Sequence, residues 1–394
     1  MKIPKRILPL IVIAQFCCTS LWFAGNGVMA YLIRHFNLEP TALGHLSAAV
    51  QFGFICGTLF FAIFTLSDRF SPSRVFFISA VAGAIFNLGV LFEGNTLFTL
   101  MASRFFTGVF LAGIYPVGMK IAADYFEKGL GRSLGLLVGA LVLGTAFPHI
   151  LAGYGKGLPW TLVIWVTSGL ALAGGLLILL FVPNGPFRKR SSGLDLYAFF
   201  KVFRKPGFRA AAFGYFGHMW ELYAFWAFVP FMIDSYTSGH SGVELSTEAL
   251  AFAVIGIGGP ACVLSGYLSG AFGTKRIASI SLASSCACCL FSPLVFVQAS
   301  PALFVVFLLF WGITVVSDSP LFSTLVAQNS LSEIKGTALT IVNCIGFATT
   351  IISIQLLNFL REVVNLQYIY VFLALGPILG LMALFRISGH NPTN

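Results

Sequence analysis

Five acidic or basic side chains of this 394-residue sequence lie deep inside long apolar segments, where a charge is costly without a partner or a function. They are Arg104, His149, His218, Glu221 and Asp318. Carboxylic acids and imidazoles can take up and release protons, and an arginine can bind an anion or balance a carboxylate. These residue types predict proton exchange and anion binding within apolar surroundings.

Glu221 is the sharpest candidate for proton exchange. It lies near the centre of the apolar run 208–233, three residues after His218, so the two side chains share one helix face. A carboxylic acid in a poorly hydrated cavity can carry a proton through a transport cycle, and His218 can assist it. The alternative for both residues, and for His149, is a fixed hydrogen bond between helices.

Asp318 and Arg104 are the next candidates. Pro320 removes a backbone N–H and frees the carbonyl of Val316, and polar groups at such a break, here Asp318, often line a cavity. The alternative for Asp318 is a gating or packing role. Arg104 would bind an anionic substrate, or balance Glu221 if both faced one cavity. Its alternatives are a structural ion pair and a side chain that reaches the membrane surface.

Aromatic and neutral polar side chains complete the predicted site. Trp22 and Asn26 are four residues apart and share a helix face, while Tyr115, Trp226 and Asn343 lie in other apolar runs. Packing in the core or against lipid is the alternative for each. The predicted substrate-binding residues are Trp22, Asn26, Arg104, Tyr115, Glu221, Trp226 and Asn343, and the predicted proton-coupling residues are Glu221, Asp318 and His218.

The amino-acid composition indicates the class of protein in which these residues are held. The chain is 58% hydrophobic and 9% charged, whereas a soluble domain is about 25% charged. This excludes a soluble enzyme, a nucleic-acid-binding domain, a disordered chain and a disulfide scaffold. A multi-pass membrane protein in contact with the lipid bilayer is left.

The eight cysteines all lie in apolar runs, where cysteine behaves as a small buried hydrophobe. The cluster Cys286-Ala-Cys288-Cys289 has no histidine or acid beside it in the sequence, so it predicts packing and not a metal site. No metal and no cofactor are expected.

Twelve apolar runs are long enough for helices that cross about 30 Å of hydrocarbon. The first continues too far for a signal peptide and lacks an Ala-x-Ala cleavage pattern, so it predicts a membrane helix. The runs are 7–33, 42–64, 74–92, 97–122, 133–153, 160–182, 208–233, 247–272, 277–298, 301–329, 335–360 and 367–386.

The net charge of +10 is a topology signal and does not indicate a nucleic-acid partner. With both termini in the cytoplasm, all but four of the 23 lysines and arginines fall in cytoplasmic segments. The exceptions are Arg34, Lys156 and Arg361 outside and Arg104 within a run. The pattern predicts twelve spans with both ends inside.

The chain divides into two halves. The longest polar stretch predicts an N-terminal bundle 1–182, a cytoplasmic linker 183–207 and a C-terminal bundle 208–394. The loops 64–74 and 266–276 are related by an offset of 266 − 64 = 202 residues and follow the second and eighth runs. The first loop has Leu66, Asp68 and Arg69, and the second has Gly266, Leu268, Gly273 and Lys275.

These paired loops and the six-plus-six layout resemble the major facilitator superfamily, whose loop signature is Gly-x-Leu-x-Asp-Arg-x-Gly-Arg-Arg. Arg104 followed by Gly108 resembles a second feature of that family. The sequence departs from the signature at Phe64 and Ser71, and Arg74 comes one place late. The resemblance implies an all-α membrane fold of twelve helices in two pseudo-symmetric six-helix bundles, alternating access and a monomer.

The signature loop predicts a gate. Asp68 and Arg69 can bind a neighbouring helix end and hold the two bundles closed on the cytoplasmic side, together with Arg74 and, in the second copy, Lys275. The alternative is a solvated anchoring turn, because surface ion pairs contribute little to stability.

Spans one and seven look like a bacterial branch grouped with nitrate/nitrite and cyanate porters. Nitrate porters bind their anion with arginines in spans two and eight, and these runs here contain no arginine or lysine. The nitrate mechanism is therefore not expected. With Arg104 as the anion contact and Glu221 or Asp318 as the proton carrier, we predict a proton-coupled carrier of a small polar or anionic solute in a bacterial inner membrane. The alternative is a proton-antiport efflux carrier for amphipathic drug-like or siderophore-like compounds.

Other classes are disfavoured. Two loop copies and several intramembrane charges argue against a sensor or assembly factor that has kept only the fold. The sequence has no clustered His, Cys or Ser constellation of the kind that would suggest an enzyme. It also has no phosphate-binding loop of the kind that would suggest that ATP drives transport. The expected partners are a small-molecule substrate, protons and lipid.

Overall fold

The computed structural model describes residues 5–126, 130–154, 159–188, 196–298, 300–331 and 335–386, which contain helices and no strand. The helices of the first half are α1 (Ile7–Thr19), α2 (Ala24–Gly27), α3 (Met29–His35), α4 (Ala42–Ile63), α5 (Leu66–Arg69), α6 (Pro72–Leu88), η1 (Gly89–Leu91), α7 (Leu97–Leu111), α8 (Tyr115–Tyr125), α9 (Leu130–Tyr154) and α10 (Thr161–Phe181).

The second half begins after the linker. Its helices are α11 (Leu196–Phe203), α12 (Pro206–Gly239), α13 (Thr247–Gly256), α14 (Gly258–Phe272), α15 (Thr274–Val297), α16 (Pro301–Ser317), α17 (Ser319–Asn329), α18 (Lys335–Val363), η3 (Ile369–Ala374) and α19 (Leu375–Arg386).

Ten helical segments among the described residues are long and apolar enough to cross a membrane. The two other predicted spans differ in recognisable ways. The first is divided into α1, α2 and α3, so no single piece is long enough. The seventh, α12, has 34 residues but is less apolar, because it carries His218, Glu221 and several tyrosines and tryptophans. The structure is consistent with twelve spans, and the chain is a multi-pass membrane protein.

Several spans are interrupted. Turns separate α1 from α2 and α7 from α8, and Asp318 separates α16 from α17 two residues before Pro320. The break expected at Pro320 is therefore present. The Cys262 thiol donates a hydrogen bond of 3.3 Å to the carbonyl of Val316, which the broken helix leaves available.

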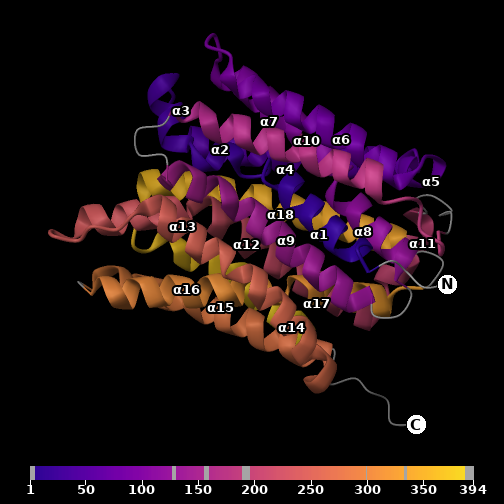
Figure 1. Ribbon diagram of the computed structural model, residues 1–394. Helices are drawn as coiled ribbons and strands as arrows, with labels where there is room; N and C mark the ends of the chain where they lie inside the picture. The colour runs from indigo at the N-terminus through magenta and orange to yellow at the C-terminus, as the bar shows by residue number, and fades with distance from the viewer. Residues whose placement is uncertain are drawn as a thin grey trace.

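The two halves repeat one packing scheme. In the first, α1 packs on α9 and α10, α6 packs on α7 and α10, and α4 packs on α7. In the second, α12 packs on α18 and α19, α15 packs on α16 and α19, and α14 packs on α16. Figure 1 shows the resulting set of roughly aligned helices, with α5 and α11 towards one end and α3 and α13 towards the other.

One close contact makes the repeat visible at the level of single residues. A Cβ on Gly108 would lie 2.1 Å from the Val50 carbonyl oxygen, and a Cβ on Gly312 would lie 2.0 Å from that of Val254. Both offsets are the same, 312 − 108 = 204 and 254 − 50 = 204. Only glycine permits this approach, so the second and fourth membrane spans of each half are held together in the same way.

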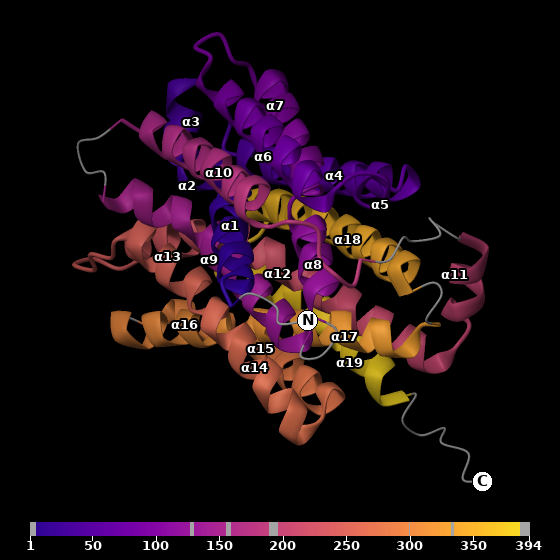
Figure 2. The same cartoon turned by 45° about the vertical axis from the view of Figure 1, so that its right-hand side comes forward.

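Four spans supply most of the contact between the two halves, one of them built from both α13 and α14. α4 lies against α18, and α9 lies against α13 and α14 (Figure 2). Near the end that carries α3, Gln355 donates to the Gly44 carbonyl at 3.2 Å and Asn358 donates to the Thr41 carbonyl at 3.1 Å. These hydrogen bonds close one end of the boundary between the halves.

The outer surface is apolar along the helices. Large hydrophobic side chains are exposed on most spans, including Phe52, Ile85, Trp165, Leu264 and Phe291. A water-soluble protein rarely exposes apolar surface on this scale, whereas lipid tails accept it. The polar residues of the candidate site are instead enclosed.

Candidate functional site

Glu221 lies inside the C-terminal half and is almost fully buried, with 1% of its surface exposed. Its Oε1 accepts hydrogen bonds from Trp311 Nε1 at 2.6 Å and from the Cys289 thiol at 3.3 Å. Its Oε2 accepts one from Ser285 Oγ at 2.9 Å. The partners come from α15 and α16, so this carboxylate joins the seventh, ninth and tenth spans.

His218 and Asp318 form a second buried centre in the same half. Nδ1 of His218 lies 2.8 Å from Oδ1 of Asp318, and both side chains are sealed from solvent. His218 comes from α12, one turn before Glu221, and Asp318 stands at the break between α16 and α17. The structure thus brings together all three residues that the sequence singled out for proton exchange.

Arg104 lies in the N-terminal half and contacts backbone rather than acid. Its guanidinium donates to the carbonyl of Leu21 at 3.1 Å, to the carbonyl of Trp22 and to Oδ1 of Asn87 at 3.2 Å. The two carbonyls belong to the turn where the first span is interrupted, which leaves them without helical partners. A buried cation is well placed there, since the end of a helix carries partial negative charge.

Arg104 and Glu221 have separate partners in separate halves. Among the described residues Arg104 makes no salt bridge, and the amide of Asn87 continues its network to Thr167 at 3.2 Å and Ser168 at 3.0 Å. In this structure Arg104 and Glu221 therefore do not form a pair in which each balances the charge of the other. Arg104 is 1% exposed, and the three residues to which it donates hydrogen bonds all lie in its own half.

A cluster of six aromatic rings lies where the halves meet. Trp22 packs on Phe54 with 4.8 Å between ring centroids, on Tyr223 with 5.6 Å and on Phe347 with 5.7 Å. We call this cluster the aromatic box. Its members are Trp22, Phe23, Phe54, Tyr223, Trp226 and Phe347, and none is more than 4% exposed.

The remaining predicted substrate-binding residues are dispersed. Asn26 donates to Ser47 Oγ at 2.9 Å, a contact between the first and second spans. Asn343 accepts a hydrogen bond of 2.7 Å from the hydroxyl of Tyr215. Tyr115 is half-buried at the start of α8. The hydrogen bonds of Asn26 and Asn343 lie within their own halves, and the three residues form no single cluster.

The residues predicted to gate lie at the end of the molecule that carries α5. Lys120 Nζ lies 2.7 Å from Oδ1 of Asp68, and Arg188 donates to the carbonyls of Asp68 and Phe70 at 2.9 and 2.7 Å. These partners of Asp68 belong to the N-terminal half and the linker. In this structure Asp68 anchors the loop within its own half, rather than reaching the other.

The three other residues predicted to gate are peripheral. Arg69 and Arg74 are exposed at the two sides of the same loop. Lys275 lies in the first turn of α15, after Gly273, whose φ of 90° lets the chain turn there. The second copy of the loop therefore ends in a sharp turn that only glycine adopts readily.

The cysteines are unpaired, and all but Cys56 are buried. The described residues contain no group of three His, Cys, Asp or Glu side chains that could hold a metal ion. The thiol of Cys289 nonetheless serves as a donor to Glu221, a polar contact that the apolar sequence around it does not suggest.

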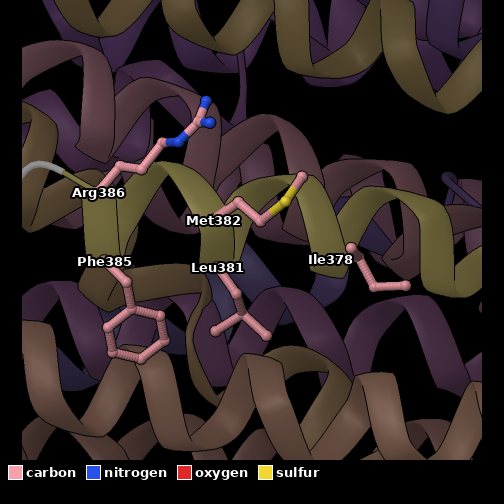
Figure 3. Close-up of a pocket in the computed structure, with 5 residues that line it drawn as sticks. All are labelled: Ile378, Leu381, Met382, Phe385 and Arg386. Carbon is pink, nitrogen blue, oxygen red and sulfur yellow. The ribbon is translucent and has the colours of Figure 1, made fainter.

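An open groove on the outer face of α19 is separate from all of these residues. Ile378, Leu381, Met382, Phe385 and Arg386 line it, and Figure 3 shows Leu381 and Phe385 on one side of that helix and Met382 and Arg386 on the other. Its side chains are mostly apolar and exposed, as expected for a surface in contact with lipid tails.

Comparison with known proteins identifies the family. The family model described as Major Facilitator Superfamily matches residues 11–354, nearly the whole chain. The chain belongs to the Major Facilitator Superfamily. The prediction of an all-α membrane fold of the major facilitator type is thereby confirmed, and so is the resemblance of the chain to that family.

A solved member of the superfamily has the same fold. The human organic anion transporter MFSD10 superposes with a TM-score of 0.75, over 97% of this chain and 100% of that one, at 15% sequence identity. Identity at this level supports the fold and carries no substrate.

Curated relatives within the superfamily match over shorter stretches. The MFS-type transporter acdC of Aspergillus candidus is 28% identical over 50% of this chain and 41% of its own length. The niacin transporter NiaP of Acinetobacter baylyi is 30% identical over 35% of this chain and 36% of its own length. A transporter of the ascochitine biosynthesis cluster of Didymella fabae is 30% identical over 34% and 26%. The chain therefore matches less than half of the length of each, and they include bacterial and fungal proteins.

Sequence reasoning missed the partners of the charged residues. Ser285, Cys289 and Trp311 are 64 to 90 residues away from Glu221, and Asn87 is 17 residues before Arg104. A serine or tryptophan in an apolar run carries no local sign of what it contacts. The only available signal was that a buried carboxylate needs donors, which the packing of distant spans must provide.

Proposed function

We propose that this membrane protein is a secondary active transporter that moves a small polar or anionic solute by alternating access, driven by protons. The observation that carries the proposal is the environment of Glu221. Glu221 is buried within a membrane-spanning bundle, and one of its three partners, the hydroxyl of Ser285, can either donate or accept, so this site can hold the side chain in two protonation states.

The three donors of Glu221 are not equivalent. The indole of Trp311 can only donate, so it favours an unprotonated Oε1. The hydroxyl of Ser285 can donate or accept, so Oε2 is the oxygen that can receive a proton without losing its partner. Glu221 would then donate to Ser285 Oγ in place of accepting from it.

Ser285 has a second acceptor ready for this exchange. Its hydroxyl also lies 3.2 Å from the carbonyl of Leu282, one turn earlier in α15. When Glu221 takes up a proton on Oε2, the hydroxyl proton of Ser285 turns to Leu282. Both protonation states of Glu221 thereby keep their hydrogen bonds, which a carrier needs if it loads and unloads protons in every cycle.

The pair of His218 and Asp318 supplies a second proton store. One proton shared between an imidazole and a carboxylic acid leaves the pair neutral overall, and a second proton makes it cationic. Asp318 stands at the break of the tenth span, so a change in the charge of the pair acts on the angle between α16 and α17. We assign this break as the point where protonation alters the shape of the C-terminal half.

The halves proposed to move are residues 1–182 and 208–394, joined by the linker 183–207. Asp68, through Lys120 and Arg188, would make the loop after α4, the end of α8 and the start of the linker move as one unit. Arg69, Arg74 and Lys275 would meet the opposing half when the cytoplasmic side closes. The protein is proposed to act as a monomer in a bacterial inner membrane with both termini in the cytoplasm.

Two features bear on the solute. The relative named as a niacin transporter is consistent with a small organic anion, although the match covers about a third of each chain. Arg104 is committed to backbone carbonyls and Asn87, so we assign it to holding the broken first span and not to binding the solute.

Transport by proteoliposomes tests the proposal. Purified protein in vesicles, with a pH gradient imposed, is expected to accumulate one or more members of a panel of small labelled carboxylates and sugars. Dissipation of the gradient with a protonophore should remove the accumulation and leave exchange of labelled for unlabelled solute. Accumulation that ignores the protonophore would contradict proton coupling.

A second candidate is efflux of amphipathic compounds by proton antiport. The aromatic box and the two fungal relatives, one of them named for a biosynthesis cluster, favour it. In the same vesicles, accumulation of lipophilic cations with an acidic lumen, and none of the carboxylates, would support this function in place of the first.

A further inference from the structure

We propose that the aromatic box binds a flat aromatic ring that carries hydrogen-bond acceptors on its edge, such as an aromatic carboxylate. This names the substrate class of the transporter and rests on the proposed function, since alternating access requires the boundary between the halves to open. Two features support this class: the orientation of the rings, and two indole N–H groups that have no acceptor among the described residues.

The box joins the two halves at one level of the boundary. Trp22 and Phe54 come from the N-terminal half, and Tyr223, Trp226 and Phe347 come from the C-terminal half. Phe54 and Phe347 lie 4.5 Å apart between ring centroids, so the contact crosses the boundary directly. A solute that passes between the halves must separate these rings or pass between them.

The faces of the box are oriented for a planar ligand. Trp22 is within 29° of parallel to Tyr223 and within 24° of parallel to Phe347. Separation of such a pair to about 7 Å, twice the contact distance of about 3.5 Å, admits one ring in contact with both faces. Stacked aromatic surfaces are more favourable than their buried area alone predicts, whereas a saturated ring cannot lie flat between them.

The edge of the box offers hydrogen-bond donors without acceptors. Nε1 of Trp22 and Nε1 of Trp226 are buried and have no hydrogen-bond partner among the described residues. A buried N–H that is left unsatisfied is costly, so both sites favour a ligand that brings lone pairs. An indole is a donor only, and this selects carboxylate, carbonyl or ring-nitrogen acceptors over ammonium groups.

Arg104 holds one wall of the box in place. Its guanidinium donates to the main-chain carbonyls of Leu21 and Trp22, and so fixes the interrupted turn from which the Trp22 ring projects. Arg104 is a positioning residue in this account. Its positive charge also lies behind the box, which favours an anionic ligand over a cationic one.

The test compares acids of equal charge that differ in the ring. The full-length protein in detergent is titrated with benzoate, nicotinate and cyclohexanecarboxylate, and binding is followed by thermal shift and calorimetry. We expect benzoate and nicotinate to stabilise the protein and cyclohexanecarboxylate to bind at least about tenfold more weakly, the equivalent of a stacking contact on each face. Equal stabilisation by the saturated acid, or none by any of the three, would overturn the assignment.

Variants separate stacking from hydrogen bonding. Trp22→Leu removes a stacking face and is expected to abolish binding. Trp22→Phe and Trp226→Phe keep a ring but remove a donor, and each is expected to weaken binding roughly fivefold. Trp165→Leu is the matched control, because Trp165 is 58% exposed on α10 and should leave the affinity unchanged. If Trp22→Leu does not fold, the two phenylalanine variants carry the test, and unchanged affinity in both would overturn it.

Failure here and failure of the proposed function give different results. Glu221→Gln should still bind benzoate, because Glu221 lies outside the box. Proton-driven accumulation of another solute with no binding of aromatic acids would refute the box and leave the transporter. Binding of aromatic acids without any proton-driven accumulation would support the aromatic box and refute the proposed proton-driven transport.

Discussion

The polar centres of the two halves are built on opposite principles. In the N-terminal half, Arg104 is a fixed cation that donates to carbonyls and to Asn87, with no acid among its described partners. In the C-terminal half, Glu221 and the pair of His218 and Asp318 are groups that can gain or lose a proton. One centre keeps its charge through a cycle and the other can change it, although both halves share one packing scheme.

This difference suits the polar centres of the two halves to different roles. A guanidinium is always charged, so it suits a structural task such as holding the interrupted first span. Carboxylic acids and an imidazole suit proton transport, and here two of these groups, His218 and Asp318, meet at the break of the tenth span.

Removal of the fixed cation should have the largest effect on stability. Arg104→Ala leaves the carbonyls of Leu21 and Trp22 buried without their donor, and it empties the space of a large side chain. We expect a loss of roughly 2–5 kcal/mol, with poor folding, as for other buried charged networks that lose one member. Thermal unfolding in detergent measures this. Arg34→Ala is the control, because Arg34 is exposed on α3, and equal stability of the two variants would refute the structural role.

Removal of the titratable group should abolish coupling and spare the fold. Glu221→Gln keeps the shape of the side chain but cannot carry a proton, so accumulation along a pH gradient should fall to the level without a gradient. Exchange of labelled for unlabelled solute should continue, because it needs no net proton movement. Transport assays in proteoliposomes check both, with Glu93→Gln on the exposed turn before α7 as the control. Accumulation at the full rate in Glu221→Gln would remove Glu221 from the coupling site.

Replacement of the hydroxyl that serves both protonation states should weaken coupling less. Ser285→Ala leaves protonated Glu221 without an acceptor on Oε2, and we expect roughly a fivefold fall in accumulation, which corresponds to one hydrogen bond. Ser285→Thr keeps a hydroxyl and should restore most of it. Ser292→Ala is the matched control on the same helix, because Ser292 is buried but bonds only the carbonyl of Cys289. If both alanine variants behave alike, Ser285 has no special part.

The smallest effect belongs to the loop. Asp68→Asn weakens the contact with Lys120, which is a partly exposed ion pair worth about 0.2–1 kcal/mol. Thermal stability should therefore change little. The transport rate should fall by less than about tenfold, with unchanged affinity for the solute, if the loop moves with its half. Loss of solute binding would show that Asp68 does not act through motion.

The sequence predicted the spans well because their signal is local. Each of the twelve apolar runs corresponds to described helices, and the interruption near Asp318 follows from Pro320, two residues away. The interruption after Thr19 carries no proline and was not foreseen, and the donor to its carbonyls, Arg104, lies more than eighty residues later in the chain. Local composition fixes where a helix crosses the membrane, but not where a distant donor allows it to break.

The candidate site was predicted unevenly for a related reason. The intramembrane charges are rare enough to be found by inspection, and His218, Glu221 and Asp318 do lie together in one half. Their roles depend on partners that ordinary residue types provide, such as Ser285 and Trp311, and no local pattern marks these. The sequence left open whether Arg104 and Glu221 face one cavity, and in the structure their described partners lie in different halves.

The most direct test of the account is the infrared absorption of protonated carboxylic acids in the purified protein, recorded as the difference between acidic and alkaline buffer. The account predicts a band from a buried acid that Glu221→Gln removes, that Ser285→Ala shifts because its hydrogen bond changes, and that Ser292→Ala leaves in place. A difference spectrum that is the same in the wild-type protein and in Glu221→Gln would contradict it, since Glu221 would then have no second protonation state to use.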